Sequence, residues 1–310
     1  MHVIEKHDYG SHTASKKKWR LLLKWSQRIF TLLAFVFIGQ YAWSVQDQLR
    51  TLLYGTNYFY LITSIFAWMT LNFIAAASSA QLLNTAGIAI SYKRILRIHV
   101  QNLPARYIPG GIWHTLGRAS HFFQLGISAK QLATFVLLEN TMAAGTALAI
   151  GGFGVHYFCR VEGWSFLSSL AFFSGATFLI IAPLAVNFRR ATAFSRILLP
   201  HYLKAMLWTV LFWISVGAIF TGYLSAFPSI VNEIHPLEAG TGYLFSWGIG
   251  FITLFSPQGI GVSEAIFSNI YPIKVSFGNV LVLVAGFRII IFIADILSWG
   301  MSCFFLKFND

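Results

Sequence analysis

The sequence predicts an all-α membrane protein that crosses the bilayer several times. Of its 310 residues, 56% are hydrophobic and only 10% are charged, whereas charged residues make up about a quarter of a typical soluble domain. Its apolar runs are long enough for helices of roughly 20 residues, and they lack the alternating pattern of a transmembrane β-barrel. We therefore expect about seven transmembrane helices and two segments, broken by glycine and proline, that re-enter the membrane or lie at its surface.

The chain begins with a basic segment, residues 1–28, that we expect to be cytoplasmic. It precedes the first apolar run, and no cleavage site of small residues follows that run, so we expect a retained span rather than a signal peptide. Residues 29–310 then form a single transmembrane domain. The expected spans are residues 29–45, 58–80, 131–153, 164–186, 205–227, 238–256 and 277–305.

The distribution of basic residues predicts the orientation. The chain has 22 Lys and Arg against 10 Asp and Glu, for a net charge of +12. Most of the basic residues lie in 1–28, 81–130 and 187–204, and the alternate loops between these regions hold only Arg50 and Arg160. This pattern indicates a cytoplasmic N-terminus. It also explains the basic charge by topology and by attraction to anionic lipid headgroups, so no nucleic-acid partner is expected.

No cofactor, metal or catalytic residue is expected from the sequence. Cys159 and Cys303 lie far apart and outside any C-x-x-C motif, so they predict neither a disulfide framework nor a metal site. A glycine-rich nucleotide loop, a metal-ligand cluster and a Ser/His/Asp arrangement are all missing.

The first broken segment covers about residues 100–126 and includes "ARYIPGGIWHTLGRASHFFQ". A helical projection places Ile112, Leu116, Ala119 and Phe123 on one side and His114, Arg118 and His121 on the other. The helix either lies on the inner leaflet, where its charges meet anionic lipid nonspecifically, or forms a pocket for one lipid phosphate with Arg118 as bidentate partner. Arg106 adds a second guanidinium, and Gly110 and Gly111 allow backbone N–H groups to approach an anion.

The second broken segment, residues 256–272, reads "SPQGIGVSEAIFSNIYP". Pro257, Gly259 and Gly261 precede Glu264, which either stabilises the first turn of a helix through its dipole or lines a polar cavity. Two short Gly/Pro-broken segments in the two halves of a membrane protein point to a transport site. The predicted count of spans puts both segments on the cytoplasmic side, and one span more or fewer would put the second segment on the opposite side.

Three further ionisable residues fall inside predicted spans and need partners, because an unpaired charge in a membrane is costly. Glu139 belongs either to a structural ion pair or to a functional site, with Arg118, Arg106 or Arg288 as the candidate partner. Arg288 and Asp295 share one helix face but lie about 10 Å apart along the axis, so each needs a partner elsewhere.

Three motifs, "ARYIPGGIWHTLGR" with the downstream "GIS", "LLEN" around Glu139, and "SPQGIGVSEAIF", resemble the lysylphosphatidylglycerol synthase transmembrane region, also called the flippase-like domain family. Their order and spacing agree over most of the chain, although Asn140 stands where the family often has Arg. The resemblance implies a multi-pass protein of the bacterial inner membrane that moves lipids. Because the sequence ends at Asp310, directly after the last expected span, we expect a stand-alone translocase without the aminoacyltransferase domain.

The sequence hypothesis is therefore a flippase for an anionic-headgroup lipid, either an aminoacyl-phospholipid or an undecaprenyl-linked or glycosylated lipid, acting beside envelope-lipid biosynthesis enzymes. The expected headgroup residues are Arg106, Gly110, Gly111, His114, Arg118 and His121. The expected cavity or coupling residues are Glu139, Pro257, Gly259, Gly261, Glu264, Arg288 and Asp295. Two alternatives stay open: a membrane-embedded transferase that uses a lipid-phosphate sugar donor, and a non-transporting scaffold in envelope polysaccharide or lipid assembly.

Overall fold

The fold is known from a computed structural model, which describes residues 54–85, 87–107, 113–158, 163–190, 198–228, 232–253, 261–270 and 277–305. Every regular element in these ranges is a helix, which confirms the all-α prediction. The expected basic segment 1–28 and the expected span 29–45 lie outside the described residues.

Five helices are long and apolar enough to cross a membrane, which supports a multi-pass membrane protein. They are α3 (Tyr58–Thr85), α6 (Ala129–Phe158), α7 (Trp164–Arg190), α8 (Leu198–Leu224) and α12 (Phe277–Phe305). Each corresponds to one of the expected spans. A long helix suits this environment because it satisfies its own backbone hydrogen bonds where lipid offers none.

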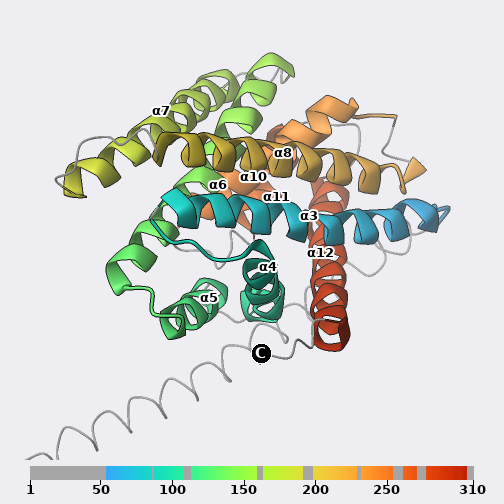
Figure 1. Cartoon of the computed structure of the whole chain (residues 1–310). Coiled ribbons are helices and arrows are strands. Elements are labelled where there is room, and N and C mark those ends of the chain that lie inside the picture. Colours follow the sequence, from blue (N-terminus) through green and yellow to red (C-terminus); the bar gives the residue numbers. More distant parts are fainter. Residues whose placement is uncertain are drawn as a thin grey trace, which may run out of the picture.

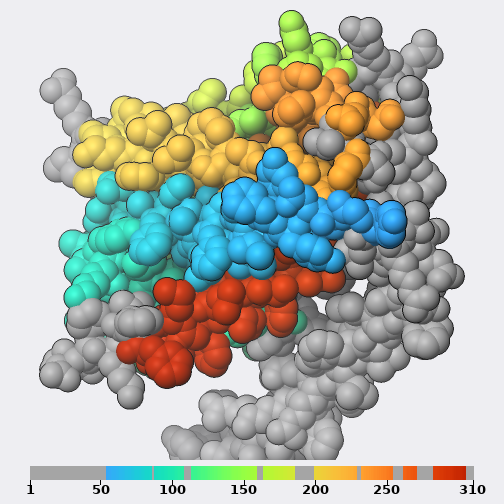
Figure 2. All heavy atoms as spheres, turned by 90° about the vertical axis from the view of Figure 1, so that its right-hand side faces the viewer, coloured from blue at the N-terminus to red at the C-terminus, as the bar shows by residue number. Residues whose placement is uncertain are grey.

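The relative direction of α3 and α8 follows from the contacts between them. α3 and α8 are antiparallel neighbours (Figure 1), since Ser78 contacts Thr209 with 2.8 Å between the hydroxyl oxygens, and Gln81 Oε1 lies 2.9 Å from Nδ1 of His201. We call the end of the bundle where α3 ends the Thr85 end, and the opposite end the Tyr58 end. In Figure 2, α3 lies between α8 and α12 on the face toward the viewer.

Glycines allow α6 to approach its neighbours closely. A Cβ on Gly152 would lie 2.6 Å from the carbonyl oxygen of Ser168 in α7, and one on Gly175 of α7 would lie 2.5 Å from the carbonyl oxygen of Gly145. In lipid, where apolar side chains gain little by leaving the solvent, such small-residue contacts hold helices together through close packing.

The first broken segment forms a hairpin at the Thr85 end, between α3 and α6. It consists of α4 (Tyr92–Gln101), the 3-10 helix η1 (Leu103–Tyr107) and α5 (Trp113–Gln124). The apolar side of α5 faces outward, with Leu116 49% and Phe123 61% exposed, whereas Arg118 is only 3% exposed. Arg118 therefore faces the protein interior. This contradicts the interpretation in which α5 lies on the inner leaflet and Arg118 contacts lipid headgroups.

The second broken segment forms a hairpin at the Tyr58 end. Its first arm, α10 (Pro236–Ile252), begins there, because the carbonyl oxygen of Pro236 accepts a 3.0 Å hydrogen bond from Thr221 near the end of α8. A Cβ on Gly248 would lie 2.8 Å from Leu148, in the middle of α6. The second arm, α11 (Val262–Ile270), returns to the Tyr58 end, where the ring of Phe267 lies 5.3 Å from that of Phe220.

Two sequence predictions are corrected by this hairpin. The apolar run 238–256 is not a crossing, because α10 has only 17 residues and is followed by a helix that turns back. One crossing fewer reverses every later direction, so the two broken segments enter from opposite ends and do not share a side. In the part of the chain that the structure describes, the count of long apolar helices is five.

α12 connects the two hairpins, because it packs against α4 and η1 of the first and against α11 of the second. Near its start, the backbone carbonyl of Leu283 accepts a 3.0 Å hydrogen bond from the hydroxyl of Tyr223, at the end of α8. Further along, Asp295 contacts Trp68 of α3 and Arg106 of η1. In Figure 1, α12 crosses α3 and α8 at a steep angle.

Each hairpin rests on its own apolar cluster. The cluster under the first hairpin includes Leu83, Ile95, Phe122 and Phe135. The cluster under the second includes Phe220, Phe245, Phe267 and Phe287. Because these side chains are almost fully buried, each hairpin is part of the packed domain.

Candidate functional site

Three arginine–carboxylate pairs join the two hairpins to the long helices. The pairs are Arg106 with Asp295, Arg118 with Glu139, and Arg288 with Glu264. The sequence singled out all six residues, and the structure assigns each its partner. Glu139 takes the first of its three candidates, and Arg288 and Asp295 each find a partner on a different hairpin.

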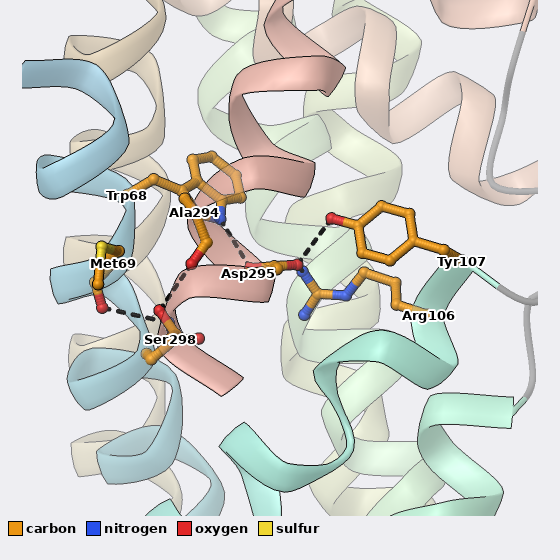
Figure 3. A network of polar contacts seen from close by, with 8 residues as sticks. Trp68, Met69, Arg106, Tyr107, Ala294, Asp295 and Ser298 are labelled. Atoms are coloured by element: carbon orange, nitrogen blue, oxygen red, sulfur yellow. Dashed lines mark hydrogen bonds and ion pairs between the residues drawn. The ribbon is translucent and has the colours of Figure 1, made fainter. Parts of the chain in front are cut away.

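Asp295 is the centre of the first pair and is completely buried. Its Oδ2 lies 3.0 Å from Nη1 of Arg106 and accepts a 2.8 Å hydrogen bond from the hydroxyl of Tyr107, while its Oδ1 accepts a 3.3 Å hydrogen bond from the indole N–H of Trp68. Figure 3 shows the carboxylate between Trp68 on one side and Arg106 and Tyr107 on the other. These donors offset the cost of burying a carboxylate. The side chain of Arg106 is 31% exposed, so its guanidinium remains partly accessible.

Tyr107 is a site residue that sequence reasoning missed, although it directly follows Arg106. Burial, reinforced by the negative charge of Asp295, raises the pKa of the Tyr107 hydroxyl, so it stays a proton donor. Its ring packs edge-on against Phe292, with 4.8 Å between ring centroids. Trp68 was missed too, because a tryptophan in an apolar helix gives no signal that it bonds a carboxylate.

Arg118 and Glu139 form the second pair, between α5 and α6. Nη1 of Arg118 donates to Oε1 of Glu139 at 3.0 Å, and Nη2 contacts Oε2, so both terminal nitrogens engage the carboxylate. Ser79 of α3 donates a further hydrogen bond of 2.8 Å to Oε1. The guanidinium also lies over the ring of Phe135, 5.6 Å from its centroid. A lipid phosphate reaches the terminal nitrogens of Arg118 only by displacing Glu139.

Asn140 stands where the resembling family often has arginine, and it takes no part in this pair. Its side-chain amide donates to the backbone carbonyl of Val136, one turn back on α6, at 2.9 Å. The departure from the family pattern therefore leaves the Arg118–Glu139 pair intact.

Glu264 forms the third pair and also caps α11. Its Oε1 lies 2.6 Å from Nε of Arg288, and its Oε2 accepts hydrogen bonds from the backbone N–H of Gly261 at 2.8 Å and from the Ser263 hydroxyl at 3.0 Å. Nη2 of Arg288 donates to the same hydroxyl at 2.7 Å. The bond from Gly261 is half of a capping box, and its φ of +85° suits glycine. Of the two roles weighed for Glu264, the structure therefore shows the first, an acid in the first turn of a helix.

The two histidines of α5 have different surroundings. The ring of His114 packs edge-on against that of His99 in α4, with 5.4 Å between centroids. His121 is exposed, and its Nδ1 lies 2.9 Å from the carbonyl oxygen of Gly117. Four other predicted site residues, Gly110, Gly111, Pro257 and Gly259, lie outside the described residues.

The first and third pairs adjoin on α12. Arg288 and Asp295 lie seven residues apart, about two turns or 10 Å along the axis. Tyr243 of α10 lies close enough to Arg288 and Glu264 to interact electrostatically with both, and it contributes to the raised pKa of Tyr107. One helix therefore carries an ion pair from each hairpin, and a buried tyrosine lies near both.

No protein-family model and no curated protein sequence matches the chain. The function is therefore inferred from the residues described above.

Proposed function

We propose that this protein is a flippase-like translocase that moves a lipid with an anionic, phosphate-bearing headgroup across the bacterial inner membrane, with its N-terminus in the cytoplasm. One observation carries the proposal. Two broken hairpins enter the helix bundle from opposite ends, and an arginine–carboxylate pair joins each of them to α12.

Hairpins of this kind suit a transporter because a substrate must be reached alternately from the two sides of the membrane. Transporters commonly place their substrate where discontinuous helices from two halves of the fold meet. Here, Arg106 lies in η1, shortly before Pro109 in the sequence, and Glu264 lies in the first turn of α11, shortly after Pro257. An ion pair that opens at one hairpin and remains closed at the other would define two states with different access.

Arg106 is the proposed headgroup residue, because it is the more accessible of the two arginines of the first hairpin that pair with a carboxylate. A phosphate that replaces the Asp295 carboxylate exchanges one oxyanion for another, so the guanidinium is never left unpaired in the membrane. Asp295 keeps the hydrogen bonds from Tyr107 and Trp68 during the exchange. Arg118 acts as a second positive charge, and Glu139 holds it in place.

The motif resemblance supports the same class of function. The three motifs contain Arg106, Arg118, Glu139 and Glu264, four of the six members of the ion pairs. The cargo classes consistent with a phosphate exchange at Arg106 are an aminoacyl-phospholipid and an undecaprenyl-linked or glycosylated lipid. Envelope-lipid biosynthesis enzymes would supply either one.

The test is a lipid-translocation assay in proteoliposomes. Fluorescent phosphatidylglycerol in the outer leaflet is bleached by a membrane-impermeant reductant, and translocation makes the inner-leaflet pool accessible too. We expect Arg106→Gln to slow translocation at least tenfold, on the order of the loss of one charge-assisted contact. Combining it with Asp295→Asn removes both charges and avoids an unpaired buried carboxylate. Arg94→Gln, on the exposed side of α4, serves as the control.

Wild-type vesicles that exchange the lipid no faster than protein-free vesicles would reject the translocase. A folded double variant with the wild-type rate would reject the assignment of Arg106. Covalent turnover of a labelled polyprenyl-phosphate sugar by the pure protein would favour the transferase instead.

A further inference from the structure

Three buried nitrogen atoms without hydrogen-bond partners gather in the first hairpin. They are Nδ1 of His99 in α4, and Nε2 of His114 and Nε of Arg118 in α5. Among the described residues, the other buried side-chain polar atoms without a partner are Thr146 Oγ1 and Trp213 Nε1, which lie on separate helices. The edge-on packing of the two imidazoles joins α4 to α5 at this point.

A cluster of this kind indicates a ligand-binding site. A buried polar atom without a partner is costly, and in native proteins it commonly marks a functional site or a bound molecule. A purely structural core would be more stable with apolar side chains at these positions. His99 contacts His114, and Arg118 lies one turn from His114 on α5, so three unpartnered nitrogens on neighbouring side chains fit a ligand that presents several acceptor oxygens.

The charges around the cluster favour an anion over a metal ion. Burial lowers the pKa of both histidines, and the positive charges of Arg118 and Arg106 lower it further, so both imidazoles are neutral near pH 7. A neutral imidazole donates from one nitrogen, and the tautomer sets which one. Although each arginine pairs with a carboxylate, it is the arginines whose charges act on both imidazoles, and this field repels a cation and attracts an oxyanion.

We propose that His99, His114 and Arg118 form an oxyanion subsite, in which His99 Nδ1, His114 Nε2 and Arg118 Nε donate to the oxygens of a phosphate group. The terminal nitrogens of Arg118 stay on Glu139, so the subsite fills without opening that ion pair. The inference rests on the proposed function only in taking the phosphate to be that of a lipid headgroup. The same donors would accept free phosphate.

Binding is tested on the purified full chain in detergent. Inorganic phosphate and short-chain phosphatidylglycerol are each titrated against sodium chloride of matched ionic strength, with thermal unfolding as the readout. We expect at least one phosphate probe to raise the unfolding temperature of the wild type. His99→Phe and His114→Phe should weaken that probe at least tenfold and leave the unfolding temperature without ligand unchanged or higher. His156→Phe, an exposed histidine on α6, is the control.

The outcomes separate a ligand site from a structural role. Lost binding together with retained stability supports the subsite, and binding of phosphatidylglycerol alone identifies a lipid headgroup. No binding of either probe by the wild type overturns the proposal, as does wild-type affinity in both phenylalanine variants. If either of these variants does not fold, His99→Gln or His114→Gln replaces it. Wild-type affinity for phosphate in the folded glutamine variant would also contradict the subsite.

The same variants in the vesicle assay distinguish this inference from the translocase. One outcome is that Arg106→Gln slows translocation whereas His99→Phe and His114→Phe do not. This would contradict the subsite as a headgroup site and would still support the translocase. Phosphate binding by a wild type that does not translocate lipid overturns the translocase and leaves the oxyanion subsite standing.

Discussion

Arg118 and Glu139 show why buried charges in this domain come in pairs. Arg118 is almost fully buried, and both of its terminal nitrogens contact the carboxylate. Removing one partner of a buried pair leaves an uncompensated charge, whereas replacing both with apolar residues is often neutral or stabilising. The pair therefore specifies how α5 lies against α6 more than it adds to the free energy of unfolding.

We predict that Glu139→Leu lowers the free energy of unfolding by about 3–5 kcal/mol, because Arg118 stays buried without a counter-ion. The double variant Arg118→Met with Glu139→Leu should recover most of that loss. Thermal or denaturant unfolding of the purified protein measures both effects. Arg94→Met, at an exposed position, is the control and should change stability by less than about 0.5 kcal/mol. A double variant as unstable as Glu139→Leu would contradict the pairing.

His99 and His114 predict a loss of stability on acidification. The folded state holds the pKa of His99 and His114 below the ordinary value of 6.5, so below pH 6.5 the unfolded chain binds more protons than the folded protein. Stability therefore falls as the pH drops through 6.5, by at most about 1.4 kcal/mol per pH unit for each histidine. We expect the unfolding temperature to decrease from pH 7.5 to 5.5. A drop of equal size in the His99→Phe, His114→Phe double variant would contradict this origin.

At the scale of elements, glycines determine how closely α6 packs against α7 and α10. A Cβ on Gly151 would collide with the backbone nitrogen of Phe245, and on the α7 side Gly152 is similarly crowded by the backbone of Ser168 and Phe172. Backbone atoms cannot rotate out of the way as a flexible side chain does. These glycines therefore set the distance between α6 and α7 and the distance between α6 and α10, the first arm of the second hairpin.

We predict that Gly152→Ala destabilises the protein by about 1–3 kcal/mol, because the new methyl group forces α6 away from α7. Gly222 provides a matched comparison inside α8, since a Cβ added there would have no heavy atom of a neighbouring element within 4 Å. Gly222→Ala should be neutral or stabilising by up to about 1 kcal/mol, the difference in helix propensity. Unfolding temperatures in detergent measure both. Equal effects of the two substitutions would show that close packing at Gly152 is unimportant.

At the scale of the whole molecule, the two hairpins enter from opposite ends and meet on α12. Asp295 and Arg288 bring the first and second hairpins to the same helix, so a movement of α12 would affect both ion pairs. Such coupling is what a protein with two alternately accessible states requires.

The opposite entry predicts which positions are labelled from the same side of the membrane. In a chain whose own cysteines are replaced by serine, Asn269→Cys and Glu233→Cys, both at the Tyr58 end, should react with an impermeant maleimide from one side. Arg94→Cys, at the Thr85 end, should react from the other. All three positions are exposed. Reaction of Asn269→Cys and Arg94→Cys from the same side would restore the topology expected from the sequence.

Much of the fold was predictable because it depends on local properties. Long apolar runs predicted α3, α6, α7, α8 and α12, since a helix in lipid needs only length and low charge. The apolar run of α10 looked the same, and only its return through α11 distinguishes it from a crossing. The six charged residues of the candidate site were predictable too, because ionisable groups in membrane segments are costly and rarely lack a role.

The sequence by itself determined that this is a helical membrane protein with two broken segments and six charges that need partners. Only the tertiary structure decided which charges pair, which face of α5 carries Arg118 inward, and that the hairpins enter from opposite ends. The physical reason is that hydropathy and helical period act over one or two turns, whereas an ion pair such as Arg106 with Asp295 joins residues 189 positions apart. His99 illustrates the same limit, since its unpartnered nitrogen becomes meaningful only beside His114 and Arg118.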